Sequence, residues 1–395
     1  MNVLTRPALQ TFLFRKDDIS LIILFVTLTS FTAGLSALVY PLLFLIAAIW
    51  IRAFTLKEAV LFICFLFVLC IISVVNVAII NNYLDLTWKG VYKLSLFAVS
   101  AIAYRNFFLS VALKNLSKLR LAIWFSFFAS LLINAGLDLQ SMQQMLILNI
   151  LFIVEFYAFI RGDTKFLFYM VVFVLFITTK KQLWFSAFVL VFLLQPRLLK
   201  GFLVVLMAAL VFVAVFGAVG GGKAGITAEQ RASSALTERF VTPDPYGNMR
   251  LYLIVTLIPK LIEHDIVWGY GLERYGTIAA YESRRDIERS ELGMDDFVPV
   301  EYNPTSLFGS VAADVGFLTI MMQMGLAGVV LYFFLFWILA REVSTLVKGV
   351  GVLLPYFLGG PIVYSVGLPV FLGLIYAILA LHNTHSDHGA RRKGF

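Results

Sequence analysis

The chain has 395 residues, of which 61% are hydrophobic and 14% are charged, and 38 of them are phenylalanine. This composition excludes an ordinary soluble domain and predicts an all-α, polytopic membrane protein. The net charge of +8 gives no reason to expect a nucleic-acid partner, because residues 220–313 are acidic, with nine Lys and Arg against thirteen Asp and Glu. The positive excess lies in the remainder of the chain, where most of it is expected to set membrane topology.

Apolar runs near the roughly 20 residues that cross a bilayer predict about twelve membrane spans. In chain order they lie at 19–36, 37–51, 59–80, 91–104, 121–135, 144–160, 166–179, 183–195, 201–219, 314–339, 349–364 and 366–382. The chain is thus divided into nine spans within 1–219, a long polar loop at 220–313, and three spans with a tail within 314–395. Lipid offers no partners for irregular backbone, so the loop is expected to fold outside the membrane and to carry the functional site.

The third predicted span contains both cysteines of the chain, Cys64 and Cys70. Their spacing of six residues places them on different helix faces, so it predicts neither a disulfide framework nor a metal site. We expect both to face lipid or to pack between helices.

Lys and Arg are concentrated in alternate connections, which the positive-inside rule assigns to the cytoplasm. Both termini belong to this set, and the 220–313 loop falls on the outer face. The outer connection at 178–182 breaks the rule because it contains Lys180 and Lys181. These lysines either snorkel at a helix end or form an anion site at the level of the lipid headgroups, and Lys89 and Lys93 look more like interfacial anchors.

Within the long loop, apolar residues at 251, 254, 257, 258, 261 and 262 predict an amphipathic helix over 249–264. Arg250 falls near its N-terminus, where the backbone also favours anions. The helix is followed by Gly269-Tyr270-Gly271, which is typical either of a tight turn or of close backbone approach to a ligand. Arg239 lies in the turn-rich stretch before the helix. His264, at the far end of the helix, is expected to be structural or exposed.

The span after the loop opens with Asp314 at its outer boundary. This carboxylate is either a helix N-cap or a base near the membrane surface. Gly325 and Gly328 follow within the same span and predict close helix packing.

Taken together, these residues resemble one family. Arg250 and Tyr252 at the head of a helix, a following Gly-Tyr-Gly, and a polar residue eleven positions before Gly325-x-x-Gly328 look like the shared region of bacterial O-antigen polymerases (Wzy type) and O-antigen ligases. The resemblance covers roughly residues 166–339. Many relatives carry Ser-Arg where this chain has Thr179-Lys180-Lys181, and the ligases carry histidine and asparagine at Asp314-Val315. The second departure favours a polymerase.

The resemblance implies a GT-C-like, metal-independent and cofactor-free inverting glycosyltransferase at the outer face of the bacterial inner membrane. It would join undecaprenyl-diphosphate-linked oligosaccharide units into an O-antigen or exopolysaccharide, with the bilayer as a partner and a chain-length regulator as a candidate partner. Arg250 would stabilise the departing diphosphate and Asp314 would act as base, with Glu301 as second choice. The implied substrate-binding residues are Lys180, Lys181, Arg239, Tyr252, Gly269 and Gly271.

Other classes stay open. An O-antigen ligase would transfer the glycan to lipid A-core instead. A flippase or transporter of the same lipid would need charges inside its spans, where Glu155 is the main exception to an almost uncharged interior. The signature of a shape–elongation–division peptidoglycan polymerase is not apparent.

Overall fold

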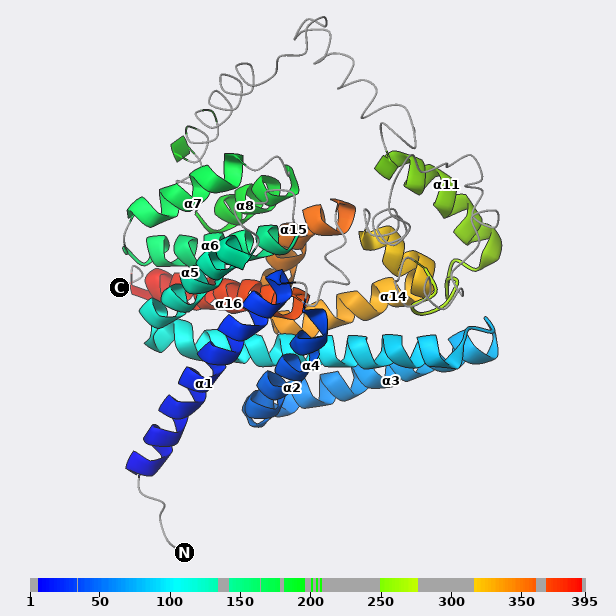
Figure 1. Cartoon of the computed structure of the whole chain (residues 1–395), viewed down its shortest axis with the longest axis horizontal. Coiled ribbons are helices and arrows are strands. Elements are labelled where there is room, and N and C mark those ends of the chain that lie inside the picture. Colours follow the sequence, from blue (N-terminus) through cyan, green and yellow to red (C-terminus); the bar gives the residue numbers. More distant parts are fainter. Residues whose placement is uncertain are drawn as a thin grey trace, which may run out of the picture.

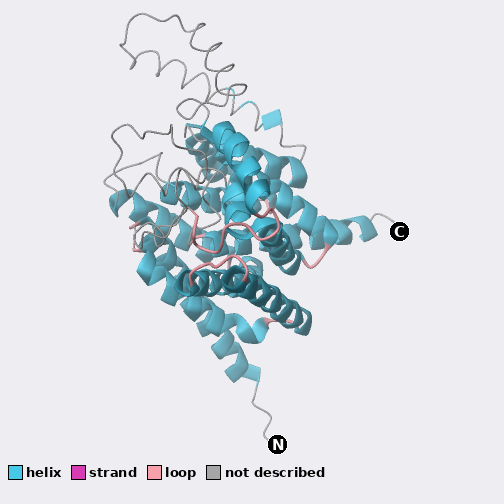
Figure 2. Ribbon diagram, turned by 90° about the vertical axis from the view of Figure 1, so that its right-hand side faces the viewer, coloured by secondary structure: helices cyan, strands magenta, loops and turns pink. Residues whose placement is uncertain are grey.

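A computed structural model of the chain describes residues 6–33, 35–133, 142–163, 165–177, 181–195, 200–201, 204, 207, 249–275, 316–359 and 367–392. These residues form helices joined by short loops, with no strand among them (Figure 2), which confirms the predicted all-α class. The helices are α1 (Arg6–Thr32), α2 (Ser36–Trp50), the 3-10 turn η1 (Ile51–Ala53), α3 (Leu56–Ala78), α4 (Leu84–Lys114), α5 (Leu116–Ile133), α6 (Met142–Ile160), α7 (Lys165–Ile177), α8 (Lys181–Leu194), α11 (Met249–His264), α14 (Gly316–Ala340), α15 (Val343–Gly359) and α16 (Leu368–Arg392).

Helix α4 is the centre of the packing. It contacts α16 along much of its length and is also lined by α2 and α3 (Figure 1). Helices α5, α6 and α7 pack in succession, and α15 joins α8 to α14. The core is built of large apolar side chains, such as Tyr104, Phe107 and Phe108 of α4, all fully buried. A well-packed interior of this kind fixes the relative positions of the helix ends, where the polar residues of the spans gather.

The outer surface of α3 is apolar. Val60, Ile63, Phe67, Ile71 and Val74 follow one another at helical spacing and are all exposed, while the opposite face is buried. A contiguous exposed apolar stripe is unfavourable in water and is the normal lipid-facing surface of a membrane helix. Cys64 and Cys70 are exposed on the same helix, which agrees with a lipid-facing position.

Each predicted span except 201–219 corresponds to one of these helices, and 201–219 lies outside the described residues apart from isolated positions. Four described helices are long and apolar enough to cross a membrane, namely Leu56–Ala78, Leu84–Val111, Leu116–Ile133 and Gly316–Ala340. Shorter apolar helices accompany them. The chain therefore has the composition and fold of a helical membrane protein, and the total of twelve crossings stays a prediction.

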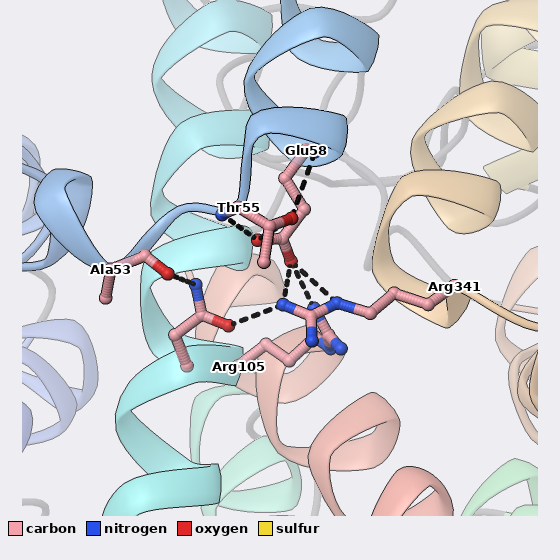
Figure 3. A network of polar contacts seen from close by, with 6 residues as sticks. Ala53, Thr55, Glu58, Arg105 and Arg341 are labelled. Atoms are coloured by element: carbon pink, nitrogen blue, oxygen red, sulfur yellow. Dashed lines mark hydrogen bonds and ion pairs between the residues drawn. The ribbon is translucent and has the colours of Figure 1, made fainter.

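Three charged side chains meet near the start of α3, in the C-terminal third of α4 and just after the end of α14 (Figure 3). Glu58 Oε1 accepts from Arg105 Nη1 at 2.5 Å and from Arg341 Nε at 3.0 Å. The Arg105 side chain is 1% exposed, whereas that of Arg341 is 37% exposed. Thr55 holds the carboxylate in place through a capping box, because its backbone N–H donates to Glu58 Oε2 at 2.8 Å. We call this end of α3, α4 and α14 the arginine end.

Glu155 is buried in α6, but its charge is balanced within the fold. Arg120 donates to both carboxylate oxygens, at 3.0 and 2.8 Å, and the Trp124 indole N–H donates at 2.9 Å. A bidentate guanidinium with a third donor is the arrangement that makes a buried carboxylate tolerable. Glu155, the main charge within a predicted span that could have favoured a transporter, thus serves to join α5 to α6.

Candidate functional site

The predicted amphipathic helix is present as α11, from Met249 to His264. Leu253, Leu257 and Leu261 form its buried stripe and pack against Leu318, Met321 and Met322 of α14. Apolar residues spaced four apart lie on one helix face, so the sequence pattern itself orients α11. The part of the long loop that the structure describes is therefore seated on a predicted membrane helix (Figure 1).

Arg250 and Tyr252 are in the first turn of α11, and only their backbone positions are described. Arg250 precedes Leu253 by three residues and Leu257 by seven, which puts its position on the same face as the buried stripe. Tyr252 is offset from Arg250 by about 200° at 100° per residue and shares its face with the exposed Val255. Arg250, the predicted catalytic residue, and Tyr252, the predicted substrate-binding residue, thus occupy opposite faces of one helix.

Beyond α11, residues 266–271 dock into a break in α14. At Gly325 the backbone has φ 58° and ψ −153°, and the regular helix is interrupted. In an unbroken helix Leu326 N–H and Ala327 N–H would donate to the carbonyls of Met322 and Gln323. Because of the break at Gly325, these two N–H groups and these two carbonyls need other hydrogen-bond partners.

The docked segment provides those partners. Tyr270 N–H donates to Met322 C=O at 2.7 Å, and Gly271 N–H to Gln323 C=O at 3.1 Å. In return, Leu326 N–H donates to Ile266 C=O at 2.9 Å, and Ala327 N–H to Val267 C=O at 3.0 Å. Irregular backbone within an apolar helix is tolerated only where protein satisfies it, and here a loop segment does so.

Glycine is required at both positions of the predicted Gly-Tyr-Gly motif. Gly269 has φ 71°, and a Cβ there would lie 2.7 Å from Gly325 N. Gly271 has φ 118°, and its Cβ would lie 2.6 Å from Asn82 Cγ. The close approach is to α14 and to the turn after α3, so the structure does not test the predicted approach to a ligand. A role for these glycines in binding diphosphate stays a prediction.

Side-chain amides from the spans hold the residues that follow. Leu272 N–H donates to Asn76 Oδ1 at 2.5 Å, and Asn82 Nδ2 donates to Leu272 C=O at 3.0 Å. Gln323 accepts from Glu273 N–H at 3.1 Å and donates to Tyr275 C=O at 2.6 Å. Burial also raises the pKa of the Tyr275 phenol, which keeps it neutral. We call this end of the helices, opposite to the arginine end, the loop end.

Sequence reasoning did not identify Asn76, Asn82 or Gln323. The available signal was an amide side chain within or at the edge of an apolar run, because such groups need protein partners in lipid. All three are buried. They position the loop backbone and leave the chemistry to other groups.

Lys93, predicted as an interfacial anchor, pairs with Glu273 of the loop. Its Nζ lies 2.6 Å from Glu273 Oε2, and the two side chains are 29% and 2% exposed. Glu273 also has φ 59°, a conformation that non-glycine residues adopt at a cost and that surrounding contacts must maintain. This ion pair therefore attaches the loop to α4, in addition to the amide contacts from α3, α14 and the turn after α3.

Replacement of Lys93 with methionine is expected to destabilise the protein by about 1–3 kcal/mol, because Glu273 would be left buried without its cation. Thermal unfolding in detergent measures the loss. Lys89→Met, one turn earlier on α4, is the matched control and is expected to change the melting temperature little. Equal melting temperatures for the Lys93→Met variant and the wild type would contradict a stabilising role for the pair.

His264 stacks on Tyr270, with ring centroids 4.0 Å apart and an interplanar angle of 5°. The Tyr270 hydroxyl in turn donates to Lys260 C=O at 3.2 Å. The prediction of a structural or exposed histidine is consistent with this position. Stacked on Tyr270, the imidazole helps to close the turn between α11 and the docked segment.

Other predicted site residues lie outside the described residues, namely Lys180, Arg239, Glu301 and Asp314. Lys181 is the first residue of α8, with its side chain undescribed. Among the described residues no three His, Cys, Asp or Glu side chains are grouped as metal ligands. Of the predicted site residues, the structure thus describes Gly269 and Gly271 and the backbone positions of Arg250, Tyr252 and Lys181.

Comparisons with family models, with curated proteins and with solved structures gave no match for this chain. The resemblance to O-antigen polymerases rests on the residues quoted above. It stays a prediction.

Proposed function

We propose that this protein is a polysaccharide polymerase that joins undecaprenyl-diphosphate-linked oligosaccharide units at the outer face of the bacterial inner membrane. The observation that best supports the proposal is the attachment of α11, with Arg250 in its first turn, to the loop end of the membrane helices. A substrate whose diphosphate lies at the lipid headgroups needs a cation held at that depth by a rigid support.

The proposed reaction is a single displacement. The acceptor hydroxyl oxygen attacks the anomeric carbon of the growing glycan while the bond from that carbon to the diphosphate oxygen breaks. The hydroxyl proton passes to a base, for which Asp314 is the candidate, and undecaprenyl diphosphate leaves with the electron pair. Negative charge grows on the leaving group, so a fixed guanidinium at Arg250 would stabilise the transition state more than the bound substrate.

Arg250→Ala is expected to lower the rate of polymerisation by about 10²- to 10³-fold, the usual effect of removing one preorganised group that stabilises transition-state charge. The measurement uses purified protein in detergent with lipid-linked repeat units alone, followed by separation of the glycans by size. A ladder that disappears in Arg250→Ala supports both the activity and the role of the arginine. Asp314→Asn tests the base in the same assay.

Lys260→Ala is the matched control, because Lys260 belongs to the same helix, is exposed, and pairs with Glu263 at 3.0 Å. Its ladder is expected to equal that of the wild type. A full ladder in Arg250→Ala would exclude this arginine from the site. Transfer only when lipid A-core is supplied would identify a ligase, and substrate translocation without either product would identify a flippase.

A further inference from the structure

A cavity of about 280 Å³ lies between the C-terminal ends of α6 and α8 and the middle of α16, away from the loop end. It is lined by Tyr157, Ile160, Arg161, Leu194, Ile378 and His382. Helix α6 packs against both α8 and α16 (Figure 1). By the positive-inside pattern this region faces the cytoplasm, since Arg161 belongs to the same set of connections as Arg105 and Arg341.

The end of α6 fixes the position of Arg161. Gly162 N–H donates to Phe159 C=O at 3.0 Å, and Asp163 N–H to Ala158 C=O at 3.0 Å. With φ 89° at Gly162, this is the Schellman pattern of helix termination. The guanidinium of Arg161 lies 5.8 Å from the centroid of the Tyr157 ring, one turn back along α6. The cation is thus held beside the cavity by a cap and by an aromatic face.

The other polar groups of the cavity are also fixed. The Tyr157 hydroxyl is buried beside the Arg161 guanidinium, which can only donate to it, so the phenol proton has no acceptor among the described residues. His382 Nε2 lies 3.0 Å from Leu194 C=O, and because a carbonyl only accepts, this nitrogen carries the proton. Ile160, Leu194 and Ile378 provide the apolar part of the cavity wall.

We propose that this cavity binds the phosphate of an anionic phospholipid headgroup. Arg161 supplies the charge, the Tyr157 hydroxyl donates a hydrogen bond to a phosphate oxygen, and the apolar wall contacts the glycerol and the first methylenes of the acyl chains. A basic pocket between membrane helices at the cytoplasmic surface is the arrangement that selects such lipids. A phosphate oxygen then gives the buried phenol proton the acceptor that Arg161 cannot supply. The proposal is independent of the polymerase reaction.

Native mass spectrometry of the full-length protein in detergent, titrated with phosphatidylglycerol, tests it. Arg161→Gln is expected to weaken phosphatidylglycerol binding about tenfold and Tyr157→Phe about threefold, as the loss of a charge-assisted and of a neutral hydrogen bond implies. Arg161→Lys should recover part of the affinity. Arg52→Gln is the control, because Arg52 is an exposed cation outside the cavity.

Two further ligands show whether the phosphate or the acyl chains account for the binding. Dioleoylglycerol, which lacks the phosphate, is expected not to bind, and glycerol phosphate, which lacks the chains, is expected to bind at least tenfold more weakly than the lipid. Equal binding of glycerol phosphate would make this a site for soluble phosphate esters and would overturn the lipid assignment. Unchanged phosphatidylglycerol affinity in both Arg161→Gln and Tyr157→Phe would overturn the site.

Discussion

Alanine at position 325 is expected to destabilise the protein by about 2–5 kcal/mol, the sum of the conformational cost of positive φ and of overpacking. Gly325 combines φ 58° with ψ −153°, a region that is essentially restricted to glycine. Its added Cβ would lie 2.3 Å from the carbonyl carbon of Val267, which is backbone and has little freedom to move. Thermal or denaturant unfolding of the purified protein in detergent measures the effect.

Gly351→Ala is the matched control. Gly351 lies in α15, and a Cβ there would meet Leu193 Cδ1 at 3.7 Å and Val189 Cγ1 at 3.9 Å, which are ordinary contacts. Because alanine is also the better helix former, this variant should be as stable as the wild type or slightly more so. If the Gly325 and Gly351 variants unfold at the same temperature, the break in α14 is not the rigid junction described above.

Glu58→Gln is expected to cost about 3–5 kcal/mol, because it leaves the guanidinium of Arg105 buried and uncompensated. Arg341, at 37% exposed, can turn towards water, but Arg105, at 1%, cannot. Glutamine can keep the capping box with Thr55, so the expected loss comes from the ion pairs and not from the cap of α3. The measurement is again the unfolding transition in detergent.

Glu263→Gln provides the control for this charge change. Glu263 is 66% exposed and pairs with Lys260 on the surface of α11, so its loss is expected to cost at most about 0.5 kcal/mol. Adding Arg105→Met to Glu58→Gln should restore part of the lost stability, since the unpaired charge is then removed. A double variant less stable than Glu58→Gln alone would show that Arg105 stabilises the fold through contacts other than Glu58.

Local patterns accounted for most of the helices. The apolar spacing in 249–264 predicted α11, and the structure buries Leu253, Leu257 and Leu261 on one face. The membrane spans could also be predicted, because a helix that crosses a bilayer needs a long apolar run. The boundaries were less accurate: α4 extends over Leu84–Lys114, whereas the predicted span covered 91–104, because polar residues near the ends of a helix hide its continuation in a hydropathy pattern.

Contacts between residues far apart in the sequence could not be predicted from local patterns. Gly325 was interpreted as a small residue for helix packing, and the break it makes depends on backbone partners at 266–271 that lie more than fifty residues earlier in the chain. Likewise, Thr55-x-x-Glu58 is a recognisable capping sequence, but nothing local to it indicates Arg105 or Arg341. Pairings of this kind depend on which helix ends meet, and that is decided by the packing of the whole bundle.

The exchange of backbone hydrogen bonds between α14 and residues 266–271 has a consequence for biogenesis. Synthesis runs from the N-terminus, so the docking segment leaves the ribosome before α14 exists, and it has no partner until α14 has entered the membrane. Conversely, α14 inserted alone would expose two carbonyls and two amides at Gly325 to lipid. Membrane insertion of this helix and folding of the docking segment are therefore coupled, and neither reaches its final form without the other.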